Sequence, residues 1–206
     1  MRHWLMKTEP DTFSIADLER VRIEPWSGVR SFFARAHMRN MTVGDQVLFY
    51  HSSVQPPGVA GLAKVARTAV VDETQFDPAS PYFDEKATRE KPIWDCVDVE
   101  FVQVFPHFVT LERLRHDPDL AEMAVLKIGR LSVQPVTLAE YVRVVEMSAT
   151  PSPVFDKPAK KPLTKKQPKP AKKPPAKKPP AKKPPGTPAK KPSGKPAKKR
   201  VRAIRR

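Results

Sequence analysis

Residues 93–105 read IWDCVDVEFVQVF, and this run of Val and aromatic residues is the clearest indication of the fold. Residues of these types fit the pleated, half-buried surface of a β-sheet. Side chains alternate between the two faces of a strand, so the run has one apolar face and one mixed face. The apolar face carries Ile93, Val97, Val99 and Phe101, and the mixed face carries Trp94, Cys96, Asp98 and Glu100. We therefore predict a β-strand over 93–105.

The sequence on either side of this strand predicts further strands mixed with short helices. Strands are expected at 3–7, 46–50, 59–71 and within 129–134, and helices at 15–20, 31–41, 110–115, 119–124 and after Thr137. Ser14 and Thr137 stand three residues before Asp17 and Glu140, which is the spacing of a capping box. The apolar stripe of the last helix is expected to hold Leu138, Tyr141, Val142 and Val145.

Residues 72–92 contain three prolines and no clear period, so a long loop is predicted there. Strands followed by isolated helices favour an α+β domain. We expect that domain to be built around a strongly curved mixed β-sheet or barrel with flanking helices.

Charge divides the chain into two parts. Residues 157–206 contain 21 of the 38 Lys and Arg residues and no Asp or Glu. The other 17 basic residues and all 22 acidic residues lie in 1–156, which gives this part a net charge of −5. The 157–206 segment also holds 13 prolines and no aromatic residue, so it cannot bury enough apolar surface to become ordered. We predict a globular domain over 1–150 and a disordered basic tail over 151–206.

Lysine pairs recur in the tail within copies of the motif Pro-Ala-Lys-Lys-Pro. Prolines at this density favour an extended polyproline II chain. Lysines on such a chain can follow a phosphate backbone and release its counterions without reading the base sequence. The expected phosphate contacts are Lys172, Lys173, Lys177, Lys178, Lys182 and Lys183. A solubility arm or a linker is the alternative interpretation.

The rest of the composition argues against several classes of protein. The single cysteine, Cys96, rules out an internal disulfide, fits a reducing compartment and lies mid-strand, where thiols are usually inert. The five histidines show no ligand spacing and no phosphate-binding glycine motif is present, so neither a metal nor a cofactor is expected. No stretch resembles a signal peptide or a membrane span. We expect a cytoplasmic protein, nucleoid-associated if its source is bacterial, with no membrane partner and no evident protein partner.

Four irregular segments of the 1–150 domain combine aromatic, cationic and hydroxyl side chains: Lys7–Pro10, Trp26–Ser31, Phe49–Ser53 and Gly129–Gln134. Pro25 and Gly28 place Trp26 outside regular structure. An indole in such a loop can cover the core, or it can offer a flat face on which a base stacks. Gly28 would let the backbone approach a ligand closely.

These segments, in this order and spacing, resemble the EVE domain, a member of the PUA-like superfamily and a relative of the YTH domain. The matching residues are Trp4–Pro10, Trp26, Gly28–Arg30, Gly44-Asp45, Phe49–Ser52, Val97–Val99 and Gly129–Val136, and they extend over about 1–147. The resemblance implies a PUA-like fold, which is a curved mixed sheet with flanking helices. It also implies a pocket that recognises a modified base in DNA or RNA, with the base flipped out and enclosed by aromatic side chains.

Carried over to this sequence, the resemblance makes Trp26 the stacking wall of that pocket. The other implied pocket residues are Lys7, Thr8, Val29, His51 and Ser52, and the implied contacts to phosphate or base edge are Arg30, Arg130 and Ser132. The chain departs from the family pattern at Thr8, Ser31, Phe33 and Ser53, and three of these changes remove amide side chains suited to a base edge.

Three aromatic residues of the long loop and the strand after it have open roles. Trp94 could be a second wall of the pocket, but packing under the 72–92 loop is the favoured interpretation. Tyr82 and Phe83 could act as lid aromatics.

We therefore predict a non-enzymatic nucleic-acid-binding protein. The 1–150 domain would recognise a modified base in an aromatic pocket, and the tail would add non-specific attraction to the phosphate backbone. One alternative is a nucleoid-associated, linker-histone-like protein that compacts DNA mainly through its tail. The other is an enzyme acting on nucleic acid through Asp98, Glu100 or Cys96, although the sequence shows no cluster of acidic residues for a metal.

Overall fold

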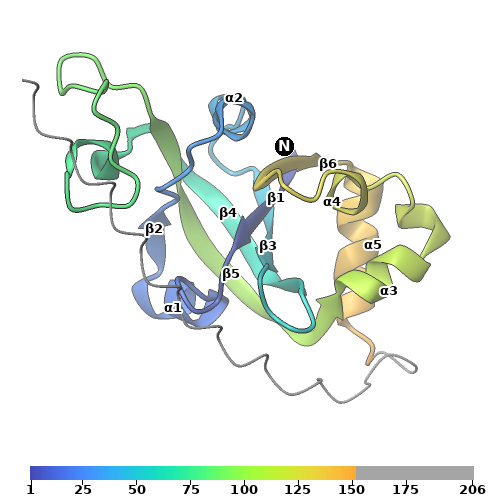
Figure 1. Ribbon diagram of the computed structural model, residues 1–206. Helices are drawn as coiled ribbons and strands as arrows, with labels where there is room; N and C mark the ends of the chain where they lie inside the picture. The colour runs from blue at the N-terminus through green and yellow to red at the C-terminus, as the bar shows by residue number, and fades with distance from the viewer. Residues whose placement is uncertain (152–206) are drawn as a thin grey trace, which may run out of the picture. The chain divides into compact units, whose positions relative to one another are not determined.

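The computed structural model describes residues 1–151, and residues 152–206 lie outside the described part. The six tail lysines expected to contact phosphate are therefore not placed. Within 1–151, six strands form one mixed sheet in the order β2-β5-β4-β3-β1-β6 (Figure 1). The strands are β1 (His3–Thr8), β2 (Ile23–Pro25), β3 (Gln46–His51), β4 (Gly58–Val71), β5 (Asp95–Thr110) and β6 (Val133–Val136).

The sheet is mixed because β1 runs parallel to β3, whereas the other neighbouring strands are antiparallel. The long β4–β5 pair changes register at four places, and irregularities of this kind bend a strand and increase its twist. Among the described residues no pairing joins the edge strands β2 and β6, so the curved sheet stays open. The prediction of an α+β domain around a curved mixed sheet is confirmed.

Alternate residues of β1 and β3 enter two separate cores, one on each face of the sheet. Trp4, Met6 and Phe49 belong to the first core, which α1 (Ile15–Val21) and α2 (Phe32–Arg39) cover. Leu5 and Leu48 belong to the second core. That core is covered by α3 (Leu111–His116), α4 (Ala124–Lys127) and α5 (Leu138–Ser148), which gather at one end of the sheet in Figure 1.

Three of the predicted helix starts agree with the structure. Ser14 and Thr137 form the expected capping boxes with Asp17 and Glu140, and the Ser31 side chain accepts a hydrogen bond from the Ala34 amide. The short helix expected at 119–124 is wrong. A 3₁₀ turn over Pro118–Leu120 stands there instead, and α4 begins at Ala124.

Two predictions about buried faces are wrong in part, although Tyr141 and Val145 of the predicted stripe do pack against the second core. β5 begins at Asp95, and four consecutive residues, Cys96 to Val99, are buried, because both faces of this strand are covered. In α5, Leu138 and Val142 are exposed, because the buried face of the helix is centred on Val144 and Met147. β2 was not predicted, because three residues ending in a proline carry no readable period.

Asp45 ties the start of β1 to the end of α2. Its carboxylate is buried and accepts hydrogen bonds from the Arg2 amide, the Trp4 indole, and the Thr42 amide and hydroxyl, at 2.8–3.0 Å. The guanidinium of Arg2 donates to the Asn40 carbonyl at 2.6 Å. The C-terminal end of α2 is therefore fixed beside the beginning of β1, and α2 runs back toward the far end of that strand.

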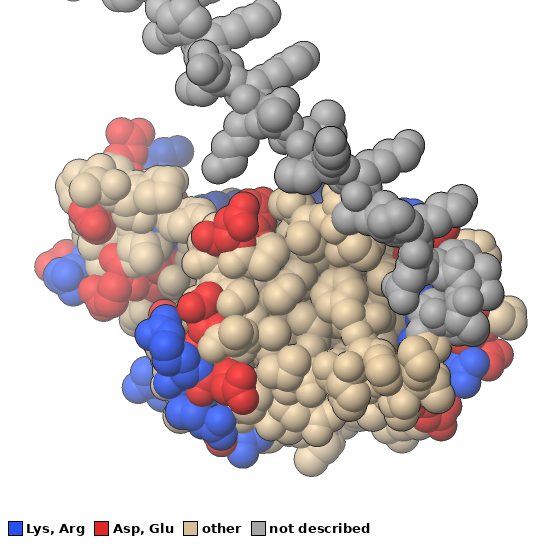
Figure 2. Space-filling model, turned by 90° about the horizontal axis from the view of Figure 1, so that it is seen from below, with Lys and Arg blue, Asp and Glu red and all other residues tan. Residues whose placement is uncertain are grey.

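The space-filling view from below shows a broad face almost without charged side chains, with Lys, Arg, Asp and Glu mixed at its margins (Figure 2). None of the helices within residues 1–151 is both long enough and apolar enough to cross a membrane.

We expect Gly61→Ala to destabilise the protein by about 2 kcal/mol, the usual cost of overpacking. A Cβ at Gly61 would lie 2.4 Å from the Gln103 carbonyl oxygen on β5, so the two strands would have to separate. Urea unfolding measures the effect. Gly129→Ala is the matched control, because a Cβ there meets nothing within 4 Å. Equal stability of the two variants would contradict the β4–β5 pairing described here.

Candidate functional site

A cavity of about 710 Å³ opens where the ends of β1, β2 and β3 meet the segment before β6. Eight of the nine residues predicted to form a site in the domain line it: Lys7, Thr8, Trp26, Val29, Arg30, Ser52, Arg130 and Ser132. Its lining also includes Glu9, Phe13, Glu24, Gly28 and Tyr82, among others. Segments more than 100 residues apart in the chain are thus brought together at one place.

Trp26 belongs to the core and to the cavity wall at once. Only 7% of the residue is exposed, and its ring meets Phe49 edge to face at a centroid distance of 5.4 Å. The Trp26 amide donates to the Val97 carbonyl at 2.8 Å, which fixes the backbone against β5. The Trp26 indole therefore covers the core and also lines the cavity, so the two interpretations of this residue are compatible.

Asp72 holds the loop that follows Trp26. Its buried carboxylate accepts hydrogen bonds from the Gly28 amide, the Arg30 guanidinium and both the amide and hydroxyl of Thr74, at 2.5–3.0 Å. Burial alone would raise the pKa of Asp72, but the hydrogen bonds from Arg30, Thr74 and Gly28 outweigh it, so the pKa is lowered. Asp72 therefore stays ionised, and the loop is fixed in one conformation.

Tyr82, from the 72–92 segment, also contacts this loop. Its ring packs so closely on Gly28 that a Cβ there would lie 2.8 Å from it, and the φ of +79° at Gly28 also favours glycine. Arg30 donates to the Tyr82 carbonyl at 2.8 Å, and its guanidinium lies 5.6 Å from the Tyr82 ring centre. Tyr82 lines the cavity, which places one of the two suggested lid aromatics at its edge.

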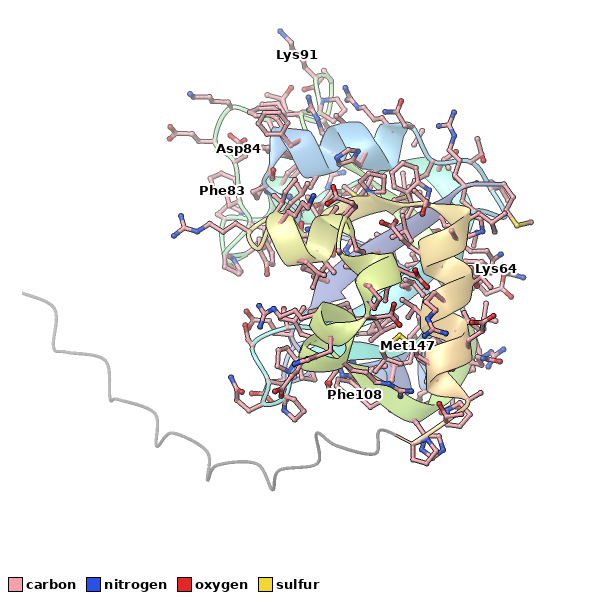
Figure 3. All side chains as sticks on the ribbon, turned by 90° about the vertical axis from the view of Figure 1, so that its right-hand side faces the viewer. Lys64, Phe83, Asp84, Lys91, Phe108 and Met147 are labelled. Carbon is pink, nitrogen blue, oxygen red and sulfur yellow. The ribbon has the colours of Figure 1, made fainter. Side chains whose placement is uncertain are left out.

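Trp94 packs under the 72–92 loop, as favoured from the sequence. Its indole donates to Asp84 of that loop at 2.8 Å, and its ring stacks on Phe32 at 4.8 Å. Figure 3 shows Phe83 and Asp84 on the loop at the α2 end of the molecule, away from Phe108 at the other end. Neither Trp94 nor Phe83 lines the 710 Å³ cavity.

Two cations of the cavity have no acidic partner within ion-pair distance in residues 1–151: Lys7 and Arg130. The Lys7 ammonium donates to the Gly129 carbonyl at 3.0 Å and lies 5.8 Å from the Tyr50 ring centre. Burial lowers the pKa of Lys7, because the charged form loses hydration there. A ligand oxygen or nitrogen in the cavity could therefore accept a hydrogen bond from a cation that no carboxylate already neutralises.

His51 is the one predicted site residue that does not line the cavity. Its Nε2 accepts a hydrogen bond from the Ile15 amide at 3.1 Å, at the first residue of α1. Burial lowers the pKa of His51, which keeps the ring neutral and able to accept. The prediction that His51 lines the pocket is therefore wrong. His51 stands between Tyr50 and Ser52 in the family motif, but its side chain turns toward the start of α1.

Thr8 and Ser52 also use their hydroxyls within the protein. Thr8 donates to the Phe13 carbonyl, and Ser52 donates to the Thr8 carbonyl, each at 3.1 Å. Both residues line the cavity, but their side chains also fix the turn between β1 and α1 to the end of β3. Thr8 and Ser52 therefore contribute mainly to the shape of the cavity.

The three residues named for an enzymatic role are all engaged elsewhere. Burial raises the pKa of Cys96 to about 12, so its thiol is unreactive at neutral pH. Asp98 forms an ion pair with Arg67 at 2.7 Å, and Glu100 forms one with Lys64 at 3.2 Å. None of the three lines the 710 Å³ cavity.

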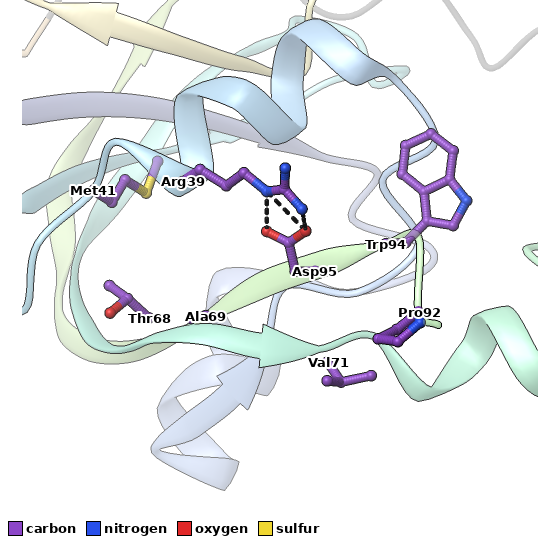
Figure 4. A pocket seen from close by; sticks show the side chains of 8 residues that line it. All are labelled: Arg39, Met41, Thr68, Ala69, Val71, Pro92, Trp94 and Asp95. Atoms are coloured by element: carbon purple, nitrogen blue, oxygen red, sulfur yellow. Dashed lines mark hydrogen bonds and ion pairs between the residues drawn. The ribbon is translucent and has the colours of Figure 1, made fainter. Parts of the chain in front are cut away.

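A second cavity, of about 350 Å³, lies among the end of α2, the end of β4 and the start of β5 (Figure 4). Its lining is mostly apolar and includes Met41, Ala69, Val71 and Trp94. Its charged residues, Arg39 and Asp95, are joined by an ion pair at 2.5 Å and thus satisfy each other. No residue predicted to form a site lines this cavity.

The model of the EVE domain family matches residues 2–147. The chain belongs to the EVE domain family. Thymocyte nuclear protein 1 of Gallus gallus is 36% identical over 164 residues, which are 70% of this chain and 68% of that protein. The curved mixed sheet with flanking helices is accordingly the PUA-like fold of EVE domains.

Two solved structures superpose closely on this one. A hypothetical protein from Leishmania major is 49% identical with a TM-score of 0.71, covering 72% of this chain and 95% of that chain. The human THYN1 protein, solved in complex with DNA containing 5-methylcytosine, is 34% identical with a TM-score of 0.69. That comparison covers 73% of this chain and 99% of the human one.

We expect Asp72→Asn to lower the free energy of unfolding by about 3 kcal/mol, since it removes the buried partner of Arg30. The amide would also turn an N–H₂ group toward donors that now meet a carboxylate. Urea unfolding measures the change. Glu73→Gln is the control, because the Glu73 side chain is 65% exposed in its ion pair with Arg89. A loss of unfolding free energy no larger than that of Glu73→Gln would contradict the role given to Asp72.

Proposed function

We propose that this EVE domain binds DNA and takes one modified base into the cavity beside Trp26. The observation that carries the proposal is the cavity, which joins an aromatic wall to unneutralised cations in a fold shared with a protein solved on 5-methylcytosine DNA. A volume of about 710 Å³ lies within the usual range for small-ligand sites.

The cavity offers what a base needs when it leaves the duplex. A flipped base loses the stacking of its neighbours, and an aromatic face replaces part of that energy. Trp26 and Tyr82 provide aromatic surface, whereas Lys7 and Arg130 provide hydrogen-bond donors. Glu9 and Glu24 add acceptors, which suit the exocyclic amino group of a cytosine or an adenine. A methyl group buried in the cavity would contribute about 0.8 kcal/mol.

The tail would supply attraction to the phosphate backbone. Residues 1–156 carry a net charge of −5, whereas 157–206 carry 21 basic residues and no acidic ones. The face in Figure 2 offers no basic track for a phosphate backbone. Tethering through the tail would raise the concentration of the EVE domain along the polymer, and the domain would then select the base.

Trp26→Ala is a poor test of base binding, since removing a buried tryptophan costs about 3–5 kcal/mol of stability. We choose Lys7→Met, which keeps the volume of the side chain and relieves the burial of a charge. We expect it to leave unfolding unchanged and to weaken binding of a 5-methylcytosine oligonucleotide about tenfold, the value of one charged hydrogen bond.

The measurement is fluorescence anisotropy with matched oligonucleotides that differ only in one methyl group, each as DNA and as RNA. Lys91→Met, a change at an exposed lysine of the 72–92 loop, is the control. An affinity of Lys7→Met for the 5-methylcytosine oligonucleotide equal to that of wild type would refute the assignment of the cavity. A preference for the modified base that appears only with RNA would show that the polymer is RNA and not DNA, and it would leave the assignment of the cavity unchanged.

We expect deletion of 157–206 to weaken binding to any long nucleic acid and to flatten its salt dependence. If about ten phosphates are engaged by the tail, log K should fall with log salt at a slope near −9 for the full chain. Titrations of both proteins at several salt concentrations measure the slopes. Identical slopes would show that the tail is not the backbone contact, and equal DNA compaction by the tail peptide alone would favour the linker-histone-like alternative.

A further inference from the structure

Phe33 is an exposed aromatic side chain that the fold itself does not use. It is 79% exposed, the largest value for any aromatic residue in the described part of the chain. Its neighbour Phe32 is also exposed, but Phe32 stacks on Trp94 at 4.8 Å and meets the Arg35 guanidinium at 4.8 Å. No comparable ring contact involves Phe33 within residues 1–151, so its exposure has no structural explanation.

The two flanks of α2 face different parts of the molecule. Phe32, Arg35 and Arg39 lie on the flank toward Trp94 and Asp95, which they contact. Phe33 and His37 are four residues apart and so share the other flank.

That second flank faces β1 and β6. The His37 ring lies 5.9 Å from Trp4 of β1, and Trp4 pairs with Pro135 of β6. Because Asn40 is bonded to Arg2, the C-terminal end of α2 lies at the start of β1. Phe33 therefore lies toward the opposite end, where Lys7 lines the cavity.

Phe33 does not line the cavity itself, but it lies in the first turn of α2, three residues after Arg30, which does. Val29 and Arg30, just before α2, line the cavity on one side, and Arg130 and Ser132, just before β6, line it on another. Phe33 stands on the same flank of α2 as His37, close in the chain to the first of these two segments. The helix is rigid at this point, because Ser31 caps it and Ala34 is fully buried.

We propose that Phe33 enters the gap that a flipped nucleotide leaves in the duplex. This inference rests on the proposed function. Proteins that open a base step often insert an apolar side chain there, since unstacking costs a few kcal/mol per step. An aromatic ring on a rigid helix beside the receiving cavity can stack on the remaining neighbours. Single-stranded DNA leaves no such gap, so Phe33 should matter for duplex DNA alone.

The test compares Phe33→Ala with the wild-type full chain on one modified strand in two forms. The probes are a duplex with a single 5-methylcytosine and the same strand without its complement. We expect Phe33→Ala to bind the duplex about tenfold more weakly, the size of one lost stacking contact, and to bind the single strand within twofold of wild type. Phe33→Leu, which keeps an apolar wedge, should retain most of the duplex affinity.

Phe83→Ala is the matched control, since Phe83 is an aromatic residue 43% exposed outside the cavity. A 2-aminopurine next to the modified base reports unstacking directly. Its fluorescence should rise when wild type binds, and at saturating protein it should rise further with Phe33→Ala, because no ring then stacks on the 2-aminopurine. Equal losses on both probes, or no loss on the duplex, would overturn the role of Phe33 while the proposed function stands. A wild-type protein without preference for the modified duplex would overturn both.

Discussion

The candidate site depends on the buried carboxylate of Asp72. The residues that it binds, Gly28, Arg30 and Thr74, belong to the loop after Trp26 and to the first turn after β4. A buried carboxylate is costly unless hydrogen bonds compensate it, and here four donors do so. The loop is therefore ordered before any ligand arrives, which reduces the entropy lost on binding.

The curved sheet explains why distant segments meet at one cavity. β1 lies between β3 and β6, so Lys7, Ser52 and Ser132 come from the ends of three adjacent strands. Trp26 follows the edge strand β2 and reaches the same place because the sheet bends through the irregular β4–β5 pair. The core on this face of the sheet and the wall of the cavity share the Trp26 indole, so the site is as rigid as the core behind it.

The sequence predicted local features well and long-range packing poorly. Ser14, Ser31 and Thr137 showed where helices begin, because capping depends on residues three positions away. The sequence did not show that His51 turns toward Ile15, that Asp72 binds Gly28, or that α5 packs through Val144. Each of these contacts depends on a partner that is distant in the chain. Of the nine domain residues that the family motifs suggested for a site, eight line the cavity. Composition alone indicated only the basic tail.

The division of labour that we propose between the two parts of the chain rests on their charges. An acidic domain with a preformed cavity is suited to selection of one nucleotide, and a basic segment is suited to attraction along a polymer. The most direct measurement of the central claim is a crystal structure of the protein with a duplex containing one 5-methylcytosine. We expect the modified base outside the duplex, in the cavity between Trp26, Lys7 and Tyr82. A base still stacked in the duplex, with the cavity away from the DNA, would contradict the account.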